Sequence, residues 1–320
     1  MRNFIIRFLL FFVILLAVGI GFEHITGKLM ISNSDFSLES APKYVILGHS
    51  KPERAYNDSI IDNFTNLAEG GESYFYTFNK SKKIIESNKS ISTVFIEFGN
   101  NSIDSKMNDF TWDSYYMASR LVRWSSLFSF SEKIKLFSHN PKCYLNSTIS
   151  VSKNNLVKLI NKQLTFTEKI GGYNKGAKPV KKSIALTKEQ LRIKELNKFD
   201  STNTEYSSTN IEYLQKLINL CRVHGKNVIL VRTPDRDDYI SRNNEIQFQK
   251  IKAKFFKEIP FFDFQKMKLN DNDFLDAGHL NFKGANKFSL WFNNLLKSNL
   301  IEERTYYKLD SLIYDFNTNK

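Results

Sequence analysis

Three short apolar segments constrain the fold of this 320-residue chain more than any other feature. They are residues 44–47, 91–98 and 228–231. Largely apolar runs of this length are typical of parallel strands that are buried on both faces. A helical pattern over residues 211–223 precedes the third run and stops before Gly225, a residue that commonly ends helices. This alternation of helix, glycine and apolar strand predicts an α/β domain with a mainly parallel sheet.

The C-terminal part of the chain extends the pattern, and one long segment interrupts it. Residues 259–264 are predicted to form an edge strand, and apolar residues at helical spacing after Lys283 predict a last helix. The segment between the second and third strands is first rich in aromatic residues and then polar, and it does not fit the alternation. We therefore expect one α/β domain over residues 43–300, with an insertion at about 104–210 and a C-terminal tail at 301–320.

The N-terminus is apolar enough to cross a membrane. Apart from Arg7, residues 4–22 carry no charge, and this length is close to the ~20 residues that span a bilayer. Arg2 and the α-amine precede the run, which by the positive-inside rule places the N-terminus in the cytoplasm. We expect residues 1–30 to be a single-pass anchor, residues 31–42 a linker, and the soluble domain to be extracytoplasmic, either periplasmic or extracellular. A cleaved signal peptide is the alternative, although no clear cleavage site follows the run.

The positive charge of the chain is concentrated in one segment. The formal net charge is +13, and residues 141–210 contain 13 Lys and Arg but only five acidic residues. No nucleic-acid-binding motif accompanies this charge, so we expect no nucleic acid partner and instead contact with anionic lipid or an anionic polymer. Cys143 and Cys221 belong to no Cys/His cluster, so we expect no metal site. They are either a disulfide or two buried free thiols.

Polar residues follow two of the predicted strands, and a further polar group lies near the C-terminus. The three groups are Gly48-His49-Ser50, Gly99-Asn100-Asn101-Ser102 and Asp276-Ala277-Gly278-His279. Sites in open α/β sheets form beyond the carboxyl ends of the strands, so we expect these groups to converge. Their residue types suit acyl transfer, because His279 can accept the proton of Ser50 and Asp276 can orient the imidazole.

In their order along the chain, these groups resemble the sequence blocks of the SGNH (GDSL-type) hydrolase superfamily. The first group resembles that family's Gly-Asp-Ser block, with His49 in place of the aspartate. The second resembles Gly-x-Asn-Asp, with Ser102 in place of the last aspartate, and the third matches Asp-x-x-His without change. Gly71, or alternatively Gly70, is similar to the isolated glycine of the family. The resemblance covers roughly residues 43–105 and 210–300 and leaves the insertion unexplained.

The resemblance implies a fold and a role for each site residue. The implied fold is a flavodoxin-like three-layer α/β sandwich with a mainly parallel sheet, here preceded by one transmembrane helix. The implied catalytic residues are Ser50, Asp276 and His279. The implied oxyanion hole comprises Ser50, Gly71 and Asn101. Candidate substrate contacts are His49 and Arg54. No cofactor and no metal is expected.

We therefore expect a membrane-anchored serine esterase or O-acyltransferase that forms an acyl-Ser50 intermediate. By resemblance, its substrate would be an acylated carbohydrate or another extracytoplasmic envelope polymer, and the residues do not separate hydrolysis from transfer. The alternative is a non-catalytic accessory protein that uses the same fold to bind a membrane-bound acyltransferase or a glycan. An enzyme requires the Ser50 hydroxyl to lie within hydrogen-bond reach of His279, whereas an accessory protein does not.

Overall fold

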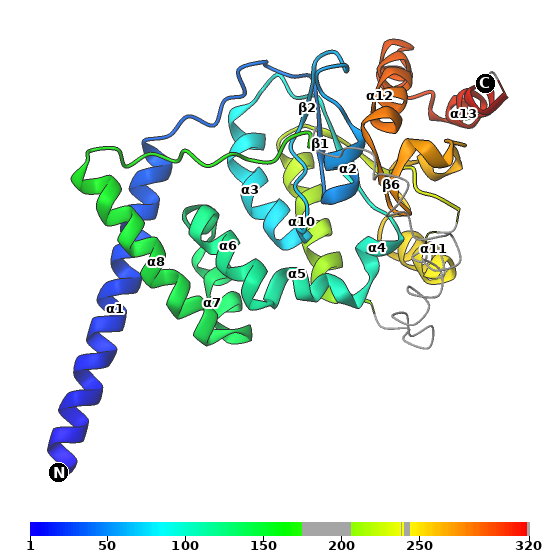
Figure 1. The fold of residues 1–320 in the computed structure, drawn as a ribbon. Coiled ribbons are helices and arrows are strands. Elements are labelled where there is room, and N and C mark those ends of the chain that lie inside the picture. Colours follow the sequence, from blue (N-terminus) through cyan, green and yellow to red (C-terminus); the bar gives the residue numbers. More distant parts are fainter. Residues whose placement is uncertain (175–205, 238, 240–243, 319–320) are drawn as a thin grey trace. The chain divides into compact units, whose positions relative to one another are not determined.

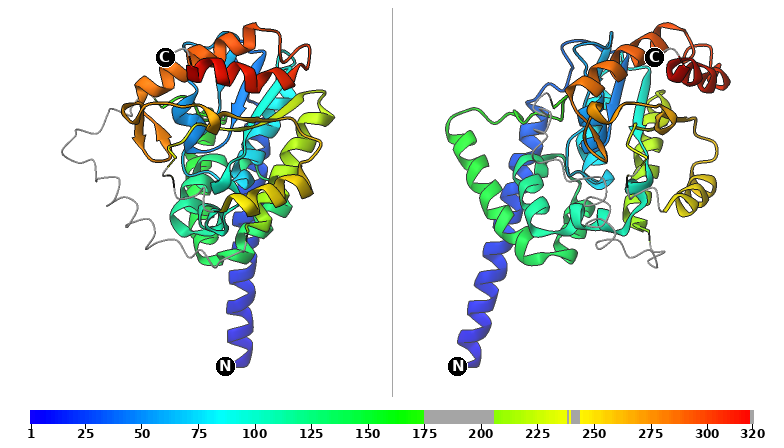
Figure 2. Two further views of the ribbon diagram at one scale, coloured as in Figure 1. Left: turned by 90° about the vertical axis from the view of Figure 1, so that its right-hand side faces the viewer. Right: turned by 45° about the vertical axis from the view of Figure 1, so that its right-hand side comes forward.

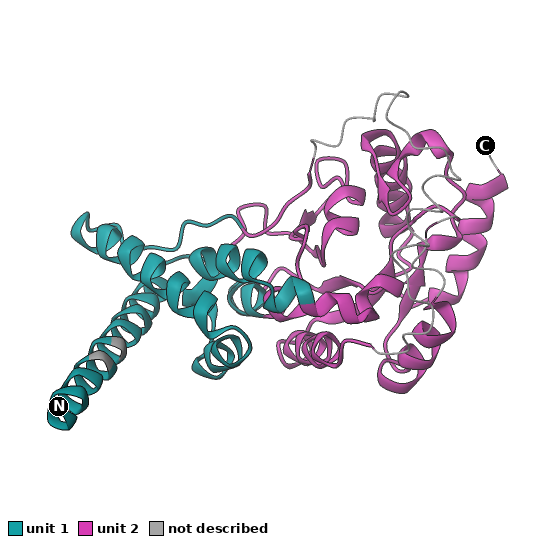
Figure 3. Ribbon diagram, turned by 60° about the horizontal axis from the view of Figure 1, so that its bottom comes forward, with its two compact units in different colours: residues 1–36, 79–87, 109–169 teal, residues 37–78, 88–108, 170–320 magenta. Residues whose placement is uncertain are grey.

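The computed structural model describes residues 1–174, 206–237, 239 and 244–318 (Figure 1). Of the basic segment at 141–210, residues 175–205 lie outside these residues. The chain forms two compact units, which Figure 3 colours separately. Unit 1 comprises residues 1–36, 79–87 and 109–169, and unit 2 comprises residues 37–78, 88–108 and 170–320.

Unit 2 is built on a five-stranded parallel sheet. In order across the sheet, its strands are β2 (Phe64–Asn66), β1 (Tyr44–Leu47), β3 (Thr93–Glu97), β4 (Asn227–Arg232) and β5 (Phe261–Asp263). The predicted mixed α/β class with a parallel sheet is therefore confirmed, and the strand predicted at 259–264 does lie at an edge. The sequence did not reveal β2, because its three residues, only one of them apolar, are too few to show a pattern.

Helices cover both faces of this sheet (Figures 1 and 2). On one face, residues of β1, β3, β4 and β5 share a buried aromatic cluster with α12 (Phe282–Lys297). The ring centroid of Tyr56 lies 5.0 Å from those of Phe288 and Phe292, edge to face, an arrangement that aromatic pairs prefer. The long helix α10 (Ser208–Val223) packs against β4. Cover on both faces explains why every residue of β1 and β3 is buried.

The remaining elements of unit 2 are mostly short. They are α2 (Ser50–Ala55), the start of α3 (Tyr74–Ser87), α4 (Asn100–Ile103), η1 (Ser105–Asn108), α11 (Glu245–Phe255), η4 (Phe264–Lys266), η5 (Asp271–Asp273), the hairpin strands β6 (Phe274–Asp276) and β7 (His279–Leu280), η6 (Tyr306–Lys308) and α13 (Leu309–Thr318). Leu309 and Ile313 of α13 are buried in the same cluster as α12. The segment expected to be a C-terminal tail therefore contains a packed helix.

Unit 1 is helical in its described elements. It contains α1 (Arg2–Ser32), the rest of α3, α5 (Asp109–Trp112), α6 (Ser114–Trp124), η2 (Ser125–Leu127), α7 (Phe130–His139) and α8 (Pro141–Ile160). By length and composition, α1 could cross a membrane. The insertion predicted at 104–210 is not one block, since residues 109–169 belong to unit 1 while Asp104 and Tyr206 pair in a β-bridge within unit 2.

A buried ion pair builds the second half of α1 into unit 1. Lys133 Nζ of α7 lies 2.9 Å from Glu23 Oε1 and 2.7 Å from Glu23 Oε2. Ser125 Oγ donates a further hydrogen bond of 2.7 Å to Glu23 Oε1, and Asn155 Nδ2 of α8 donates one of 2.9 Å to Thr26 Oγ1. Charges are stable in a protein interior only when they are paired and hydrogen-bonded. The second half of α1 is thus part of the folded unit and is more than the membrane anchor expected from the sequence.

Candidate functional site

The first polar group forms a tight turn between β1 and α2. Gly48 has φ = 145°, a conformation that favours glycine, and α2 begins at Ser50 directly after it. A Cβ atom on Gly48 would lie 2.8 Å from Glu97 Cβ and 2.9 Å from Pro52 Cγ. The absence of a side chain at Gly48 therefore lets β1 and β3 approach closely where the serine leaves the sheet.

This close approach gives a prediction for Gly48. The Gly48→Ala variant should be destabilised by about 3 kcal/mol, because the new methyl group adds overpacking to backbone strain. Gly225→Ala is a matched control: Gly225 also has a positive φ, 70°, but its added Cβ would meet nothing within 4 Å. Thermal unfolding should rank Gly48→Ala below Gly225→Ala. Equal melting temperatures would show that the turn is not tightly packed.

The Asp-x-x-His group is a small hairpin. Asp276 of β6 pairs with His279 of β7, and the two residues between them form the turn. His279 Nδ1 lies 2.9 Å from Asp276 Oδ1 and 3.0 Å from Oδ2, while Gly278 N donates to Oδ1 at 2.9 Å. Burial alone would raise the pKa of the Asp276 carboxyl. The hydrogen bonds and charge of His279, with the backbone N–H groups, outweigh burial and lower that pKa below its ordinary value.

The serine and the hairpin meet in one hydrogen-bonded chain. Ser50 Oγ lies 2.7 Å from His279 Nε2. Because the carboxylate of Asp276 accepts the Nδ1 proton, Nε2 of a neutral His279 carries the lone pair that accepts from the Ser50 hydroxyl. The structure therefore brings the three sequence-predicted catalytic residues into hydrogen-bond contact. The side chain of Ser50 does not cap α2, whose N-cap residue is His49.

Flanking residues fix the hairpin on α12. Asn281 caps α12 by accepting from the backbone N–H groups of Lys283 and Gly284, and its Nδ2 donates to Asn272 O and Phe274 O. A Cβ on Gly284 would lie 2.1 Å from the backbone oxygen of Asp273, so a glycine is needed for this close packing. The hairpin is therefore held in a fixed position at the start of a long, buried helix.

The Gly99–Ser102 group lies at the start of α4, after β3. Ser102 Oγ accepts a hydrogen bond of 3.2 Å from Gly99 N, so Ser102 stabilises this turn. Asn100 Oδ1 accepts from the buried guanidinium of Arg232 at 3.0 Å. Asn101 Nδ2 lies 2.5 Å from His49 Nε2. The amide of Asn101, expected in the oxyanion hole, is thus engaged with His49 and not with Ser50.

Gly71 and Arg54 are the other two predicted site residues. Gly71 has φ = 65° and follows β2 in a loop where Glu69 N donates to Gly48 O at 3.0 Å, so this loop lies beside the serine turn. Arg54 is half-buried on α2, four residues after Ser50. Cys143 and Cys221 are both buried free thiols, which excludes a disulfide between them in this structure.

Sequence reasoning missed a buried ion pair next to the serine. Lys51 Nζ lies 2.6 Å from Asp235 Oδ2, and their side chains are only 3% and 1% exposed. The ammonium also lies 4.4 Å from the centre of the Tyr239 ring, and that ring packs against Gly278 of the Asp276–His279 hairpin. Nothing local distinguishes Lys51 from an exposed lysine, because its partner is 184 residues away.

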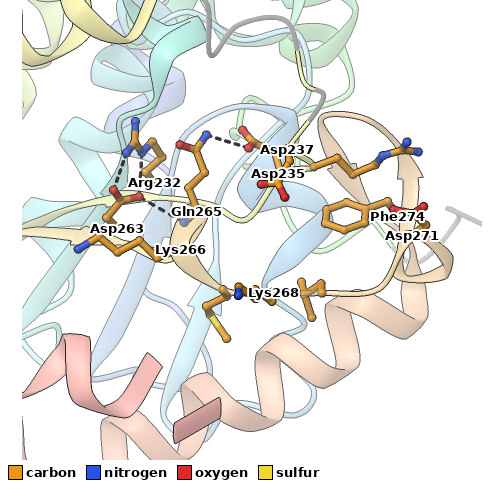
Figure 4. Close-up of a pocket in the computed structure, with 12 residues that line it drawn as sticks. Arg232, Asp235, Asp237, Asp263, Gln265, Lys266, Lys268, Asp271 and Phe274 are labelled. Atoms are coloured by element: carbon orange, nitrogen blue, oxygen red, sulfur yellow. Dashed lines mark hydrogen bonds and ion pairs between the residues drawn. The ribbon is translucent and has the colours of Figure 1, made fainter. Parts of the chain in front are cut away.

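A polar cavity of about 530 Å³ borders this ion pair (Figure 4). Gln265 Nε2 donates to Asp235 Oδ1 at 2.8 Å, and Arg232 is paired with Asp263 in the same cavity wall. Ser50, Asp276 and His279 are not among the residues that line it. The cavity is therefore adjacent to the candidate site through Asp235 but does not contain the hydrogen-bonded triad.

Comparison with known proteins adds little to this geometry. An uncharacterised family model matches residues 182–301, which include Asp276 and His279 but not Ser50. No curated protein matches the chain. The fold and the site together define an α/β protein with a Ser-His-Asp arrangement at the carboxyl edge of a parallel sheet. Any functional assignment therefore rests on that arrangement.

Proposed function

We propose that this protein is an SGNH-like serine enzyme that accepts an acyl group from an ester onto Ser50. The observation that carries the proposal is the hydrogen-bonded chain from Ser50 Oγ to His279 Nε2 at 2.7 Å and from His279 Nδ1 to Asp276 at 2.9 Å. A serine hydroxyl is a weak nucleophile until a base takes its proton, and an imidazole oriented by a carboxylate is such a base.

The strand order supports a flavodoxin-like fold for unit 2. An order of 2-1-3-4-5 is that of flavodoxin-like sheets, in which ligands bind at the switch point between β1 and β3. Ser50 follows β1 and Asn101 follows β3, so both flank this switch point. This position, together with the four sequence blocks, favours a flavodoxin-like SGNH fold.

The proposed reaction uses the triad in two steps. Ser50 Oγ attacks the ester carbonyl while His279 Nε2 takes the hydroxyl proton, and Asp276 stabilises the imidazolium that forms. The carbon–oxygen bond of the ester then breaks, and His279 returns the proton to the leaving oxygen. Water or an acceptor hydroxyl releases the acyl group from Ser50, which gives an esterase or an O-acyltransferase respectively.

The N-terminal helix supports a location at a membrane. We propose that α1 anchors the protein by a single pass with its basic N-terminus in the cytoplasm, so that the remainder is periplasmic or extracellular. In that compartment the proposed substrates are ester-linked acyl groups of a glycan or another envelope polymer. A non-catalytic accessory protein does not require Ser50 to lie near His279, whereas an enzyme does, so the observed distance favours the enzyme.

A fluorophosphonate probe tests this proposal without knowledge of the acyl acceptor. The probe should phosphonylate the full-length, detergent-purified protein on Ser50, as located by mass spectrometry of the peptide. The Ser50→Ala variant should remain unlabelled. A folded wild-type protein that gives no adduct at Ser50 would favour the accessory role instead.

A further inference from the structure

The hydroxyl of Ser50 faces a second imidazole besides that of His279. His49 is buried, and its Nδ1 lies 3.3 Å from Ser50 Oγ. The other nitrogen of the same ring, Nε2, lies 2.9 Å from Glu97 Oε2 at the end of β3 and 2.5 Å from Asn101 Nδ2. Ser50 therefore lies between two histidines, each of which contacts a carboxylate.

Glu97 is an unusual residue for the end of a central strand. Its side chain is 0% exposed, and within the described residues neither of its carboxylate oxygens has a well-aligned hydrogen bond. Lys51, a buried cation whose charge also interacts with that of Glu97, is already paired with Asp235. A buried carboxyl group without a partner is costly, so the contact with His49 is the interaction that compensates Glu97.

The number of protons available around Ser50 indicates whether His49 Nδ1 donates or accepts. The only proton of the hydroxyl is donated to His279 Nε2, so a favourable contact with His49 requires that Nδ1 carries a proton and donates to Ser50 Oγ. Nε2 then accepts, both from Asn101 Nδ2 at 2.5 Å and from the Glu97 carboxyl, held as the acid, at 2.9 Å. With Nε2 as the acceptor, Nδ1–H points at the serine oxygen.

We propose that His49 is a catalytic residue that donates a hydrogen bond from Nδ1 to the oxyanion of the tetrahedral intermediate, and that Glu97 is the positioning residue that keeps Nδ1 protonated. This inference rests on the proposed function. When the Ser50 oxygen bonds to the carbonyl carbon, the π electron pair moves onto the carbonyl oxygen next to it, and the serine proton moves to His279. The His49 proton is not transferred. Its Nδ1–H replaces the donor that the Asn101 amide would provide, since that amide contacts His49.

Two readouts test the role of His49 on the full-length protein in detergent. The first is the rate of fluorophosphonate labelling and of p-nitrophenyl acetate hydrolysis. His49→Leu should lower both rates by about 100-fold with little change in KM, the size of effect seen when one oxyanion donor is lost. His49→Asn, whose amide nitrogen can occupy the place of Nδ1, should retain rates within about tenfold of wild type. His224→Leu, at an exposed histidine after α10, should leave the rates unchanged.

The role of Glu97 is tested by a double-mutant cycle. Glu97→Leu should lower the labelling rate of the wild-type protein several-fold but should have no further effect in the His49→Leu background, because Glu97 acts through His49. A residue with a purely structural role would lower the rate equally in both backgrounds.

The second readout is the ¹⁵N spectrum of histidine-labelled wild-type protein, with the His49 signals assigned by their loss in His49→Asn. It needs neither activity nor a stable His49→Leu variant. A protonated Nδ1 supports the proposal, and a bare Nδ1 overturns it. Wild-type rates in a folded His49→Leu variant would overturn it as well, whereas a wild-type protein that fails to label at Ser50 contradicts the proposed function.

Discussion

Replacing Ser50 with alanine should lower the rate of ester turnover by about 10⁴-fold or more, because the acyl-enzyme can no longer form. His279→Ala should be about as damaging, and the double variant Ser50→Ala/His279→Ala no worse than either single variant. This lack of additivity is expected since Ser50 Oγ and His279 Nε2, 2.7 Å apart, act as one unit. Steady-state hydrolysis of p-nitrophenyl acetate measures all three, with thermal melting as the control for folding.

Asp276→Asn extends this series to the third residue. The amide would donate to His279 Nδ1, so the imidazole proton would lie on Nε2. Nε2 could then no longer accept the serine proton, and where the carboxylate is buried this change lowers kcat by about 10⁴-fold. Here the Asp276 side chain is 51% exposed, so the loss should be smaller. Because its pKa is lowered, Asp276 keeps its charge, and its contact with His279, until the pH falls below the usual range of aspartate. Unchanged turnover in Asp276→Asn would remove Asp276 from the mechanism.

Replacing Asp235 with leucine should destabilise unit 2 by about 3–5 kcal/mol, because it leaves the Lys51 ammonium buried without its partner. The melting temperature should fall by roughly 10 °C. Burial opposes the charged form of Lys51, but the charges of Asp235, Tyr239 and Glu97 outweigh burial and raise its pKa. The stabilisation by this pair is therefore complete below the ordinary lysine value and is lost only as the pH rises through the raised pKa.

Two controls separate the effect of a buried pair from that of any lost charge. Lys266 and Asp310 form an exposed pair, with side chains that are 54% and 72% exposed respectively. Asp310→Asn removes the carboxylate of this pair and should leave the melting temperature nearly unchanged. The double variant Lys51→Met/Asp235→Leu should recover most of the lost stability, because no unpaired charge remains. If the single and double variants melt together, the ion pair is not what stabilises this part of unit 2.

The sheet and the contact of Ser50 with His279 and Asp276 could be predicted because their signals are local in sequence. A continuous apolar run marks each of the strands β1, β3 and β4, and polar residues directly after two of them mark the carboxyl edge of the sheet. Since that edge is shared, residues as far apart as Ser50 and His279 could be expected to meet. The spacing of Asp276 and His279 is also local, because a two-residue turn joins the strands on which they lie.

The surroundings of His49 and Lys51 could not be predicted, because they depend on which buried groups the fold brings together. The partner of Lys51 is 184 residues away, and no pattern in the sequence links the two. Glu97 did carry a signal, since a carboxylate at the end of an otherwise apolar strand is rarely buried without a purpose. The packed part of α1 was hidden for the same reason, because Glu23 and Thr26 are buried by partners more than 100 residues away along the chain.

The pair of Glu23 and Lys133 also bears on the effect of removing the N-terminal helix by proteolysis. Proteolytic removal of residues 1–30 would take away Glu23, the buried partner of the Lys133 ammonium, together with a helix that packs against α8. The same cut would remove Met30, which is buried in the intact chain. A leader peptide normally makes no contacts in the mature fold, whereas the second half of α1 supplies buried contacts of unit 1. A version shortened by these 30 residues should therefore be less stable than the intact protein.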